Sequence, residues 1–239
     1  MTKIIAHRGS SGTHPENTME AFDEAEKVGV DGIELDVQLS KDGFIVVIHD
    51  ETVNRTTNGK GWIKDLTYSQ LKKLDASNKF KKLFSVSRIP SLEEVCKWAL
   101  KNQLIINVEL KNGLINYSEL EEKVIQLIRK YQLENRVILS SFNHYSLVKC
   151  SKLAPEIETA PIFMEGLYEP WDYAKRLGAS SIHPYHPVAT REMIEQSHDH
   201  GIAVRAFTVN KVKLMEELAK HNCDAIITDY PMKAVSNLK

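Results

Sequence analysis

The sequence predicts an α/β protein folded as a single (β/α)8 TIM barrel with a small insertion after the second strand region. Short runs rich in Ile and Val alternate with longer segments of helical periodicity along the chain. About eight such runs are present, and parallel strands joined by helices close most naturally into a barrel. The length of 239 residues, with 42% hydrophobic and 26% charged residues, fits one such domain over residues 1–239.

The expected strands, in order, are Ile4–His7, Gly32–Leu39, Leu104–Leu110, Arg136–Ser141, Thr159–Met164, Ser180–His183, Ala203–Thr208 and Ala225–Thr228. The expected helices between them are Thr18–Val28, Leu92–Lys101, Ser118–Tyr131, His144–Leu153, Pro170–Leu177, Arg191–His200 and Lys211–His221. Asn17 is expected to cap the first helix, and Ser91 with Glu94 has the spacing of a capping box. Glycines follow three predicted helix ends: Gly29, Gly178 and Gly201.

Residues 50–88 interrupt this alternation. The stretch contains NRTTNGKGWIKDLT, a short helical piece around Ser69–Leu74, and the basic run KFKKLF. It is too short and polar to form a core of its own, so we interpret it as an insertion at the barrel mouth. A loop there is a candidate substrate gate, and the alternative is a surface excursion without a function. KFKKLF is most simply a solvated charged face.

The charge and cysteine content limit the classes of partner. With 31 Lys plus Arg against 32 Asp plus Glu, no general positive field favours nucleic acid or anionic membranes, so a local cluster must hold any anion. The three cysteines lie far apart without a CxxC pair, which is typical of a reducing compartment. We find no signal-peptide pattern and no apolar run of about 20 residues. We therefore expect cytoplasmic localisation and no stable membrane insertion, and a homodimer remains possible.

Polar residues stand at the ends of several apolar runs, and in a barrel those ends converge on one site. They are His7 and Arg8, Glu34 and Asp36, His49 and Asp50, and Glu109 and Lys111. Residues two apart on a strand point to the same face, about 6–7 Å apart. Glu34 and Asp36 therefore share one face, and their apolar neighbours face the helices.

Three of these residues, Glu34, Asp36 and Glu109, have the hard oxygen ligands that Mg²⁺ or Ca²⁺ prefers. Buried charges are costly unless they are paired or bound to a metal, so this density of carboxylates suggests one divalent cation. The positive charge of that cation, Arg8 and Lys111 exceeds the negative charge of the three carboxylates by one. A phosphodiester monoanion would balance this excess. The pattern predicts a metal-assisted phosphodiester site.

His7 and His49 flank this set. An imidazole titrates near neutrality, so one ring can accept a proton while the other donates one. Either histidine alone is more commonly structural, and the joint arrangement favours an acid/base pair.

The motifs HRG, PENT, GIELDVQLSKDG, HD, RTTNGKG, ELK and ITDYP occur in this order from His7 to Pro231. Their order and spacing resemble the glycerophosphodiester phosphodiesterase family in its bacterial, cytoplasmic form. The resemblance implies a TIM barrel, a Ca²⁺ or Mg²⁺ cofactor, and hydrolysis of small-molecule glycerophosphodiesters to glycerol 3-phosphate and an alcohol. It implies roles for matching residues: Glu34, Asp36 and Glu109 as metal ligands, His7 and His49 as the acid/base pair, Arg8 and Lys111 as phosphate-binding cations.

One position departs from the family. Many members have Trp where this chain has Phe207, and Phe lacks the indole donor that could recognise the glycerol or the alcohol. Phe207 is thus a candidate substrate contact or a packing residue. Glu16, His183 and Asp229 are weaker candidates, and we expect no direct catalysis by His183 or Asp229.

Three alternatives remain from the sequence. A lysophospholipase D or phospholipase C-like lipid phosphodiesterase would need an apolar or basic docking surface, for which only KFKKLF and Trp62 are candidates. A non-catalytic phosphodiester-binding barrel would not need two histidines. A sugar-phosphate isomerase would not need three clustered carboxylates in addition to two histidines. The nucleophile is either water or a neighbouring hydroxyl of the substrate.

Overall fold

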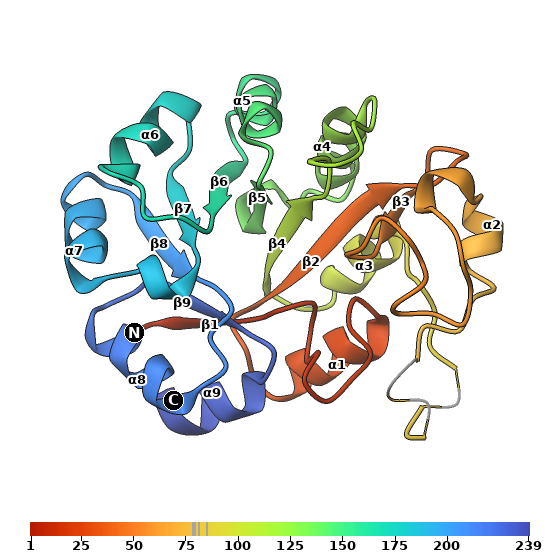
Figure 1. Cartoon of the computed structure of the whole chain (residues 1–239), viewed down its shortest axis with the longest axis horizontal. Coiled ribbons are helices and arrows are strands. Elements are labelled where there is room, and N and C mark those ends of the chain that lie inside the picture. Colours follow the sequence, from red (N-terminus) through yellow and green to blue (C-terminus); the bar gives the residue numbers. More distant parts are fainter. Residues whose placement is uncertain (78–79, 81, 85) are drawn as a thin grey trace.

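The computed structural model describes residues 1–77, 80, 82–84 and 86–239. In this part of the chain, eight parallel strands form a ring in the order β1-β9-β8-β7-β6-β5-β4-β2, closed by pairing of β1 with β2 (Figure 1). The strands are β1 (Lys3–Ala6), β2 (Gly32–Leu39), β4 (Ile105–Leu110), β5 (Val137–Ser141), β6 (Glu158–Phe163), β7 (Ser181–Pro184), β8 (Ala203–Ala206) and β9 (Ala225–Thr228). The predicted TIM barrel is confirmed.

Helices surround the ring on its outer side (Figure 1). They are α1 (Met19–Lys27), α3 (Leu92–Ala99), α4 (Leu120–Lys130), α5 (His144–Leu153), α6 (Pro170–Leu177), α7 (Arg191–Asp199), α8 (Val212–Lys220) and α9 (Pro231–Leu238), with short 3₁₀ turns at Glu134–Arg136 and His186–Val188. The expectation omitted α9, although Pro231 at its first turn is a typical helix start. None of the described helices combines the length and the apolarity needed to cross a membrane.

The alternation along β2 separates the apolar core from the charged interior. All eight residues of the strand are buried. Ile33, Leu35 and Val37 join the main apolar cluster with residues of the surrounding helices. Glu34 and Asp36 point to the opposite face, as the period of two requires. One side of the strand thus packs in the apolar core, and the other side presents its carboxylates to the barrel interior.

The first helix is capped by a different residue from the one expected. Thr18 is the N-cap, and its side chain accepts a hydrogen bond from the Ala21 amide. Asn17 has a positive φ of 56° and uses its side-chain Nδ2 to donate to Asp36 Oδ2 at 2.8 Å. The expectation for Asn17 was wrong because a tertiary hydrogen bond outweighs its local capping preference. The capping box of Ser91 and Glu94 is present as expected.

The insertion contains more structure than the sequence suggested. It is preceded by β3 (Ile45–Val47), which pairs antiparallel with β2, and it includes a 3₁₀ turn (Ile63–Asp65) and α2 (Tyr68–Leu71). Val53, Ile63, Leu71 and Ala76 of the insertion form a small apolar cluster with Val46, Ile48 and Ile89, which flank it in the sequence. The insertion therefore shares this small core with the flanking chain. Lys79 and Lys81 of KFKKLF lie outside the described residues.

Candidate active site at the barrel mouth

Three buried carboxylates form the centre of the site. Glu34 and Asp36 come from β2, and Glu109 comes from the adjacent β4, where it pairs in register with Asp36. One oxygen atom from each residue lies within 4.8 Å of the others. Their exposed fractions are 3%, 0% and 9%, so little water screens their charges. The structure thus brings together the three residues that the sequence singled out as metal ligands.

The electrostatics of this centre suit a cation. Burial, together with the charges of Asp36 and Glu109, raises the pKa of Glu34 well above its usual value. Burial and Asp36 also raise the pKa of Glu109. Glu34 Oε1 and Asp36 Oδ1 are buried without a hydrogen-bond partner among the described residues. A divalent cation would satisfy both oxygens and remove the repulsion, so the residues fit such an ion.

Arg8 reaches the same centre from a tight turn after β1. Arg8 and Gly9 have φ of 53° and 76°, and a Cβ at Gly9 would lie 2.7 Å from backbone atoms of Ala21. The Arg8 amide donates to Glu34 Oε2 at 2.8 Å, and Arg8 Nε lies 3.4 Å from Asp36 Oδ2. Burial opposes the charge of Arg8, but Asp36, Glu16 and Glu34 outweigh it and raise its pKa.

Lys111 approaches from the other side, directly after β4. Its Nζ donates to Glu109 Oε1 at 2.9 Å and lies 3.2 Å from His49 Nε2. Burial would lower the pKa of Lys111, but Glu109 and Asp36 raise it above its usual value. Two permanent cations therefore flank the carboxylate centre.

His7 and His49 are held in the same way on two sides of the centre. His7 Nδ1 lies 2.6 Å from Asp229 Oδ1, and His49 Nδ1 lies 2.7 Å from Asp50 Oδ1. Since a carboxylate accepts hydrogen bonds, each Nδ1 carries a proton and each Nε2 is left for other partners. His7 Nε2 is 3.9 Å from Glu34 Oε2. Both Nε2 atoms thus lie beside the carboxylates or their cations.

Both aspartates are kept ionised. Burial would raise the pKa of Asp229, but the hydrogen bond and charge of His7 outweigh it and lower the value to about 2. Hydrogen bonds from Arg55 strongly lower the pKa of Asp50, and they outweigh the opposing effect of its partial burial. An ionised partner fixes the tautomer and orientation of each imidazole.

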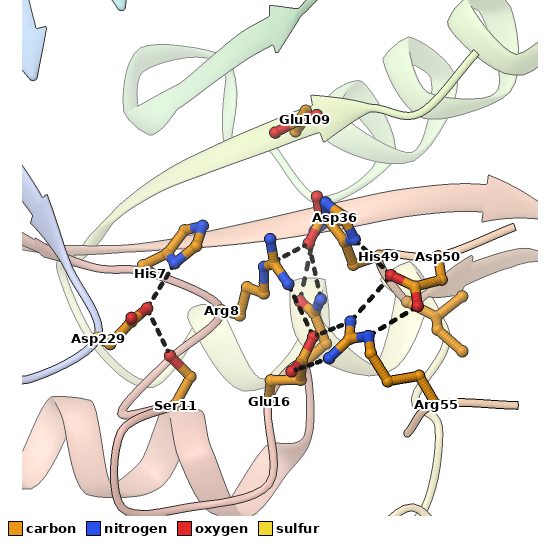
Figure 2. Close-up of polar contacts among 12 residues, drawn as sticks. His7, Arg8, Ser11, Glu16, Asp36, His49, Asp50, Arg55, Glu109 and Asp229 are labelled. Carbon is orange, nitrogen blue, oxygen red and sulfur yellow. Dashed lines mark hydrogen bonds and ion pairs between the residues drawn. The ribbon is translucent and has the colours of Figure 1, made fainter. Parts of the chain in front are cut away.

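A chain of ion pairs connects the insertion to the site (Figure 2). Arg8 Nη1 donates to Glu16 Oε1 at 2.8 Å. Arg55 donates to both oxygens of Glu16, at 2.7 and 2.8 Å, and to both oxygens of Asp50, at 2.7 and 2.9 Å. Arg55, which the sequence argument did not single out, thus couples residues near both histidines. Arg55 is the first residue of the RTTNGKG motif, but the motif alone did not indicate its partners.

Some of these residues line a cavity of about 170 Å³, whereas the predicted site residues Asp36 and Lys111 lie behind its walls. Of the sequence-predicted residues, His7, Arg8, Glu34, His49, Glu109 and Phe207 form its walls. Phe207 meets Phe142 edge to face, with 6.1 Å between the ring centroids. His183 lies deeper, and burial lowers its pKa well below the usual value. The cavity therefore has a charged wall and an aromatic wall.

The mouth of this TIM barrel holds a buried carboxylate centre, two cations and two histidine–aspartate pairs. These are the features of a hydrolase that acts on an anionic substrate. The model of the glycerophosphoryl diester phosphodiesterase family matches residues 7–233. The chain belongs to this family and is a phosphodiesterase, as its motifs predicted.

The similarity to known members extends over nearly the whole chain. A glycerophosphodiester phosphodiesterase of Caldanaerobacter subterraneus subsp. tengcongensis is 47% identical over 96% of this chain and 95% of its own length. One from Bacillus altitudinis is 46% identical over 98% and 97%. An Oleispira antarctica phosphodiesterase, solved in complex with the product sn-glycerol-3-phosphate, has a TM-score of 0.94 at 30% identity, covering 100% of this chain and 97% of that one.

Proposed function

We propose that this phosphodiesterase hydrolyses glycerophosphodiesters to glycerol 3-phosphate and an alcohol, with one divalent cation and two histidines. The observation that carries the proposal is the pair of imidazoles, each bound through Nδ1 to an ionised aspartate, on two sides of a buried carboxylate centre. The names of the relatives and the product complex of the Oleispira protein support the choice of substrate class.

Glu34, Asp36 and Glu109 would hold the cation, Mg²⁺ or Ca²⁺. Two observations support this assignment: the unsatisfied oxygens of Glu34 and Asp36, and the raised pKa of Glu34 caused by burial and by its carboxylate neighbours. When bound, a divalent cation supplies Lewis-acid polarisation of a phosphoryl oxygen.

Arg8 and Lys111 would bind the non-bridging phosphate oxygens. Each cation lies beside the carboxylate centre, and nearby carboxylates keep the pKa of each above its usual value, so both remain charged at neutral pH. Fixed cations at this position stabilise the negative charge that develops on the phosphoryl oxygens in the transition state.

His7 and His49 would transfer the protons. One imidazole accepts a proton at Nε2 from the attacking hydroxyl, the new P–O bond forms, and the bond to the leaving alcohol breaks. The other imidazole, which carries a proton on Nε2 as well as on Nδ1, donates its Nε2 proton to the leaving oxygen. Asp229 and Asp50 hold the rings without reacting themselves. When water attacks, glycerol 3-phosphate forms directly; when the neighbouring hydroxyl of the substrate attacks, a cyclic phosphate forms, and water then opens it to glycerol 3-phosphate.

The test is the rate of glycerol 3-phosphate release from several glycerophosphodiesters, compared with the rate of lysophosphatidic acid release from lysophospholipid micelles. We expect turnover of the water-soluble diesters. Turnover restricted to micelles would favour the lipid phosphodiesterase alternative, for which the half-exposed Trp62 in the insertion is the structural candidate. No hydrolysis of any phosphodiester would favour a binding protein instead.

A further inference from the structure

A buried amide side chain lies behind the His49 segment. Gln38 follows Asp36 by two residues on β2, on the same face of the strand, and is fully buried. Its Nε2 donates to the backbone carbonyl oxygens of Ile48, His49 and Asp50, at 3.0, 3.0 and 2.7 Å. One side chain therefore holds three consecutive residues, and the middle one is a proposed proton-transfer histidine.

This contact needs an amide donor. Carbonyl oxygens only accept hydrogen bonds, so the atom on which three of them converge must carry protons, and the Gln38 amide supplies two N–H groups. A glutamate of the same size would place carboxylate oxygens against the three carbonyls, and a buried carbonyl without a donor is costly. Gln38 is thus matched to the segment in hydrogen-bonding character as well as in size.

Tyr117 fixes the orientation of the amide. Its hydroxyl donates to Gln38 Oε1 at 2.9 Å, and the tyrosine itself is buried. Burial, with the charges of Glu51 and Asp65, raises the pKa of Tyr117, so the phenol keeps the proton that it donates. With Oε1 bound to a donor, Nε2 must face the three carbonyls. The amide therefore has one orientation that satisfies both of its ends.

The amide also connects the His49 segment to the segment that carries Lys111. Tyr117 lies between β4 and α4, in the segment that follows Lys111. The Lys111 amide donates to the carbonyl oxygen of Val37, the residue before Gln38, at 3.1 Å. Across the site, Lys111 Nζ lies 3.2 Å from His49 Nε2. Gln38 thus lies where the two segments that bring these side chains together are joined.

A second amide lies behind His7. Asn210 Nδ2 donates to Asp229 Oδ2 at 2.7 Å, and Asn210 Oδ1 accepts from the Asp229 amide at 3.0 Å. His7 is therefore held through the aspartate that binds its ring. His49 is held through its backbone as well, because Gln38 binds its carbonyl and those of both its neighbours. An amide thus backs each histidine, by two different routes.

We propose that Gln38 is a positioning residue for His49 and that Tyr117 sets the direction of its amide. The inference rests on the proposed function, in which His49 transfers a proton. Gln38 is not among the described residues that line the catalytic cavity, so it acts through His49 and not on the substrate. It fixes the backbone from which the imidazole extends. A misplacement of about 1 Å can lower a rate on the order of 100-fold, so a small movement of this backbone matters.

A purely structural role of Gln38 leads to different expectations. Gln38 would then only tie β2 to the chain after β3, and its loss would lower stability without a specific effect on His49. Effects of residues that act through one group are not additive, whereas independent effects add. Removing the His49 imidazole therefore separates the two roles.

The experiment measures kcat and KM for glycerophosphocholine at saturating Mg²⁺ or Ca²⁺, with each variant made in the wild type and in His49→Ala. Gln38→Leu should lower kcat about 10- to 100-fold, the range typical of residues that orient a reacting group, and leave KM within about twofold. Gln38→Glu keeps the size but lacks the donor, so it should not restore kcat. Tyr117→Phe should lower kcat about 3- to 10-fold. In His49→Ala, each of these changes should cost less than about twofold.

Two matched changes control for the loss of an amide and of a phenol hydroxyl. Asn102→Leu removes an amide that precedes β4, at the opposite end of the barrel. Tyr131→Phe removes a hydroxyl that donates to Glu93 on the outer helices. Both should retain wild-type kcat. The thermal unfolding midpoint of every variant shows which of them are folded at the assay temperature.

Three outcomes would overturn the positioning role: wild-type kcat in folded Gln38→Leu, wild-type kcat in Gln38→Glu, or a loss from Gln38→Leu that persists in full in His49→Ala. If Gln38→Leu does not fold, Tyr117→Phe decides, because its loss must disappear in His49→Ala and an equal loss in both backgrounds refutes the proposal. Near-normal turnover by His49→Ala would refute the two-histidine scheme itself. A strongly impaired His49→Ala beside an unaffected Gln38→Leu refutes only the positioning role.

Discussion

The two sides of the barrel mouth differ in chemistry. The side formed by β9, β1, β2 and β4, together with the insertion, carries the charged groups of the catalytic cavity. Figure 2 shows the contacts that hold most of these groups, such as the one between His7 and Asp229, and Lys111 donates to Glu109. The side formed by β5 to β8 carries aromatic rings, several of them exposed. Figure 1 shows these two groups of strands on opposite parts of the ring. The comparison suggests that one side performs the reaction and the other recognises the substrate.

The two sides should also differ in their tolerance of substitution. A change on the charged side leaves a buried partner unpaired, which costs several times more than a lost surface contact. A change on the aromatic side removes contact area from groups that water already reaches.

The largest effect is expected at the histidines. His7→Ala or His49→Ala should lower kcat about 10²- to 10⁴-fold, because general acid or base catalysis contributes about that much. Steady-state assays with glycerophosphocholine measure the loss. His221→Ala, at the end of α8, is the control and should retain wild-type turnover. Near-normal turnover by either active-site variant would end the two-histidine scheme.

A smaller effect is expected from the residue behind His7. Asp229→Asn should lower kcat about 10- to 100-fold, since groups that orient a reacting residue typically contribute in this range. KM should change little, because Asp229 holds the ring and does not reach the substrate. An unchanged kcat with a raised KM would place Asp229 in substrate binding. Ser11→Ala removes a hydroxyl that donates to Asp229 and should have a milder effect.

Asp229 should also affect stability in a pH-dependent manner. Its pKa is lowered to about 2 in the folded state, mainly by the hydrogen bond and charge of His7 acting against burial. A lowered folded-state pKa stabilises the protein above the unfolded value of 3.8, and this contribution is lost as pH falls toward 2. We expect Asp229→Asn to cost about 1–2 kcal/mol at pH 6, discounted for partial exposure, and less near pH 3. Urea titrations at both pH values measure the difference; a gap that widens at low pH would contradict it.

The smallest effect is expected on the aromatic side. Phe207→Leu should raise KM about 3- to 10-fold and leave kcat within about twofold, because an aromatic pair adds about 0.5–1.5 kcal/mol beyond burial. Phe207→Trp introduces an indole N–H donor at this position and tests whether that donor improves binding. A large loss of kcat in Phe207→Leu would mean that the aromatic side takes part in the reaction and would break the comparison.

The sequence predicted the barrel and the charged groups well because both leave local signals. Periodic apolar runs mark strands and helices, and charged residues such as Glu34 at the end of such runs stand out against them. The three-residue β3 lacked the length to be recognised. At Asn17, a local capping rule failed because the side chain bonds to Asp36 on a neighbouring strand.

Partners that depend on barrel closure left no such signal. Asp229 lies 222 positions from His7 in the sequence and reaches it only because β9 pairs with β1. Arg55 reaches Glu16 because the insertion folds back over the mouth. The aromatic side was missed for a related reason: Tyr168 and Tyr173 come from irregular and helical segments with no shared periodicity. Long-range pairing therefore sets the limit of what the sequence alone could predict.

The central claim is that the carboxylate centre acts with a divalent cation in phosphodiester hydrolysis. The most direct measurement is glycerol 3-phosphate release from glycerophosphocholine after EDTA treatment, followed by addition of Mg²⁺ or Ca²⁺, for the wild type and for Glu109→Gln. We expect loss of release with EDTA, recovery in the wild type with one of the two ions, and little recovery in Glu109→Gln at the same ion concentration. Release that is unchanged by EDTA would contradict it.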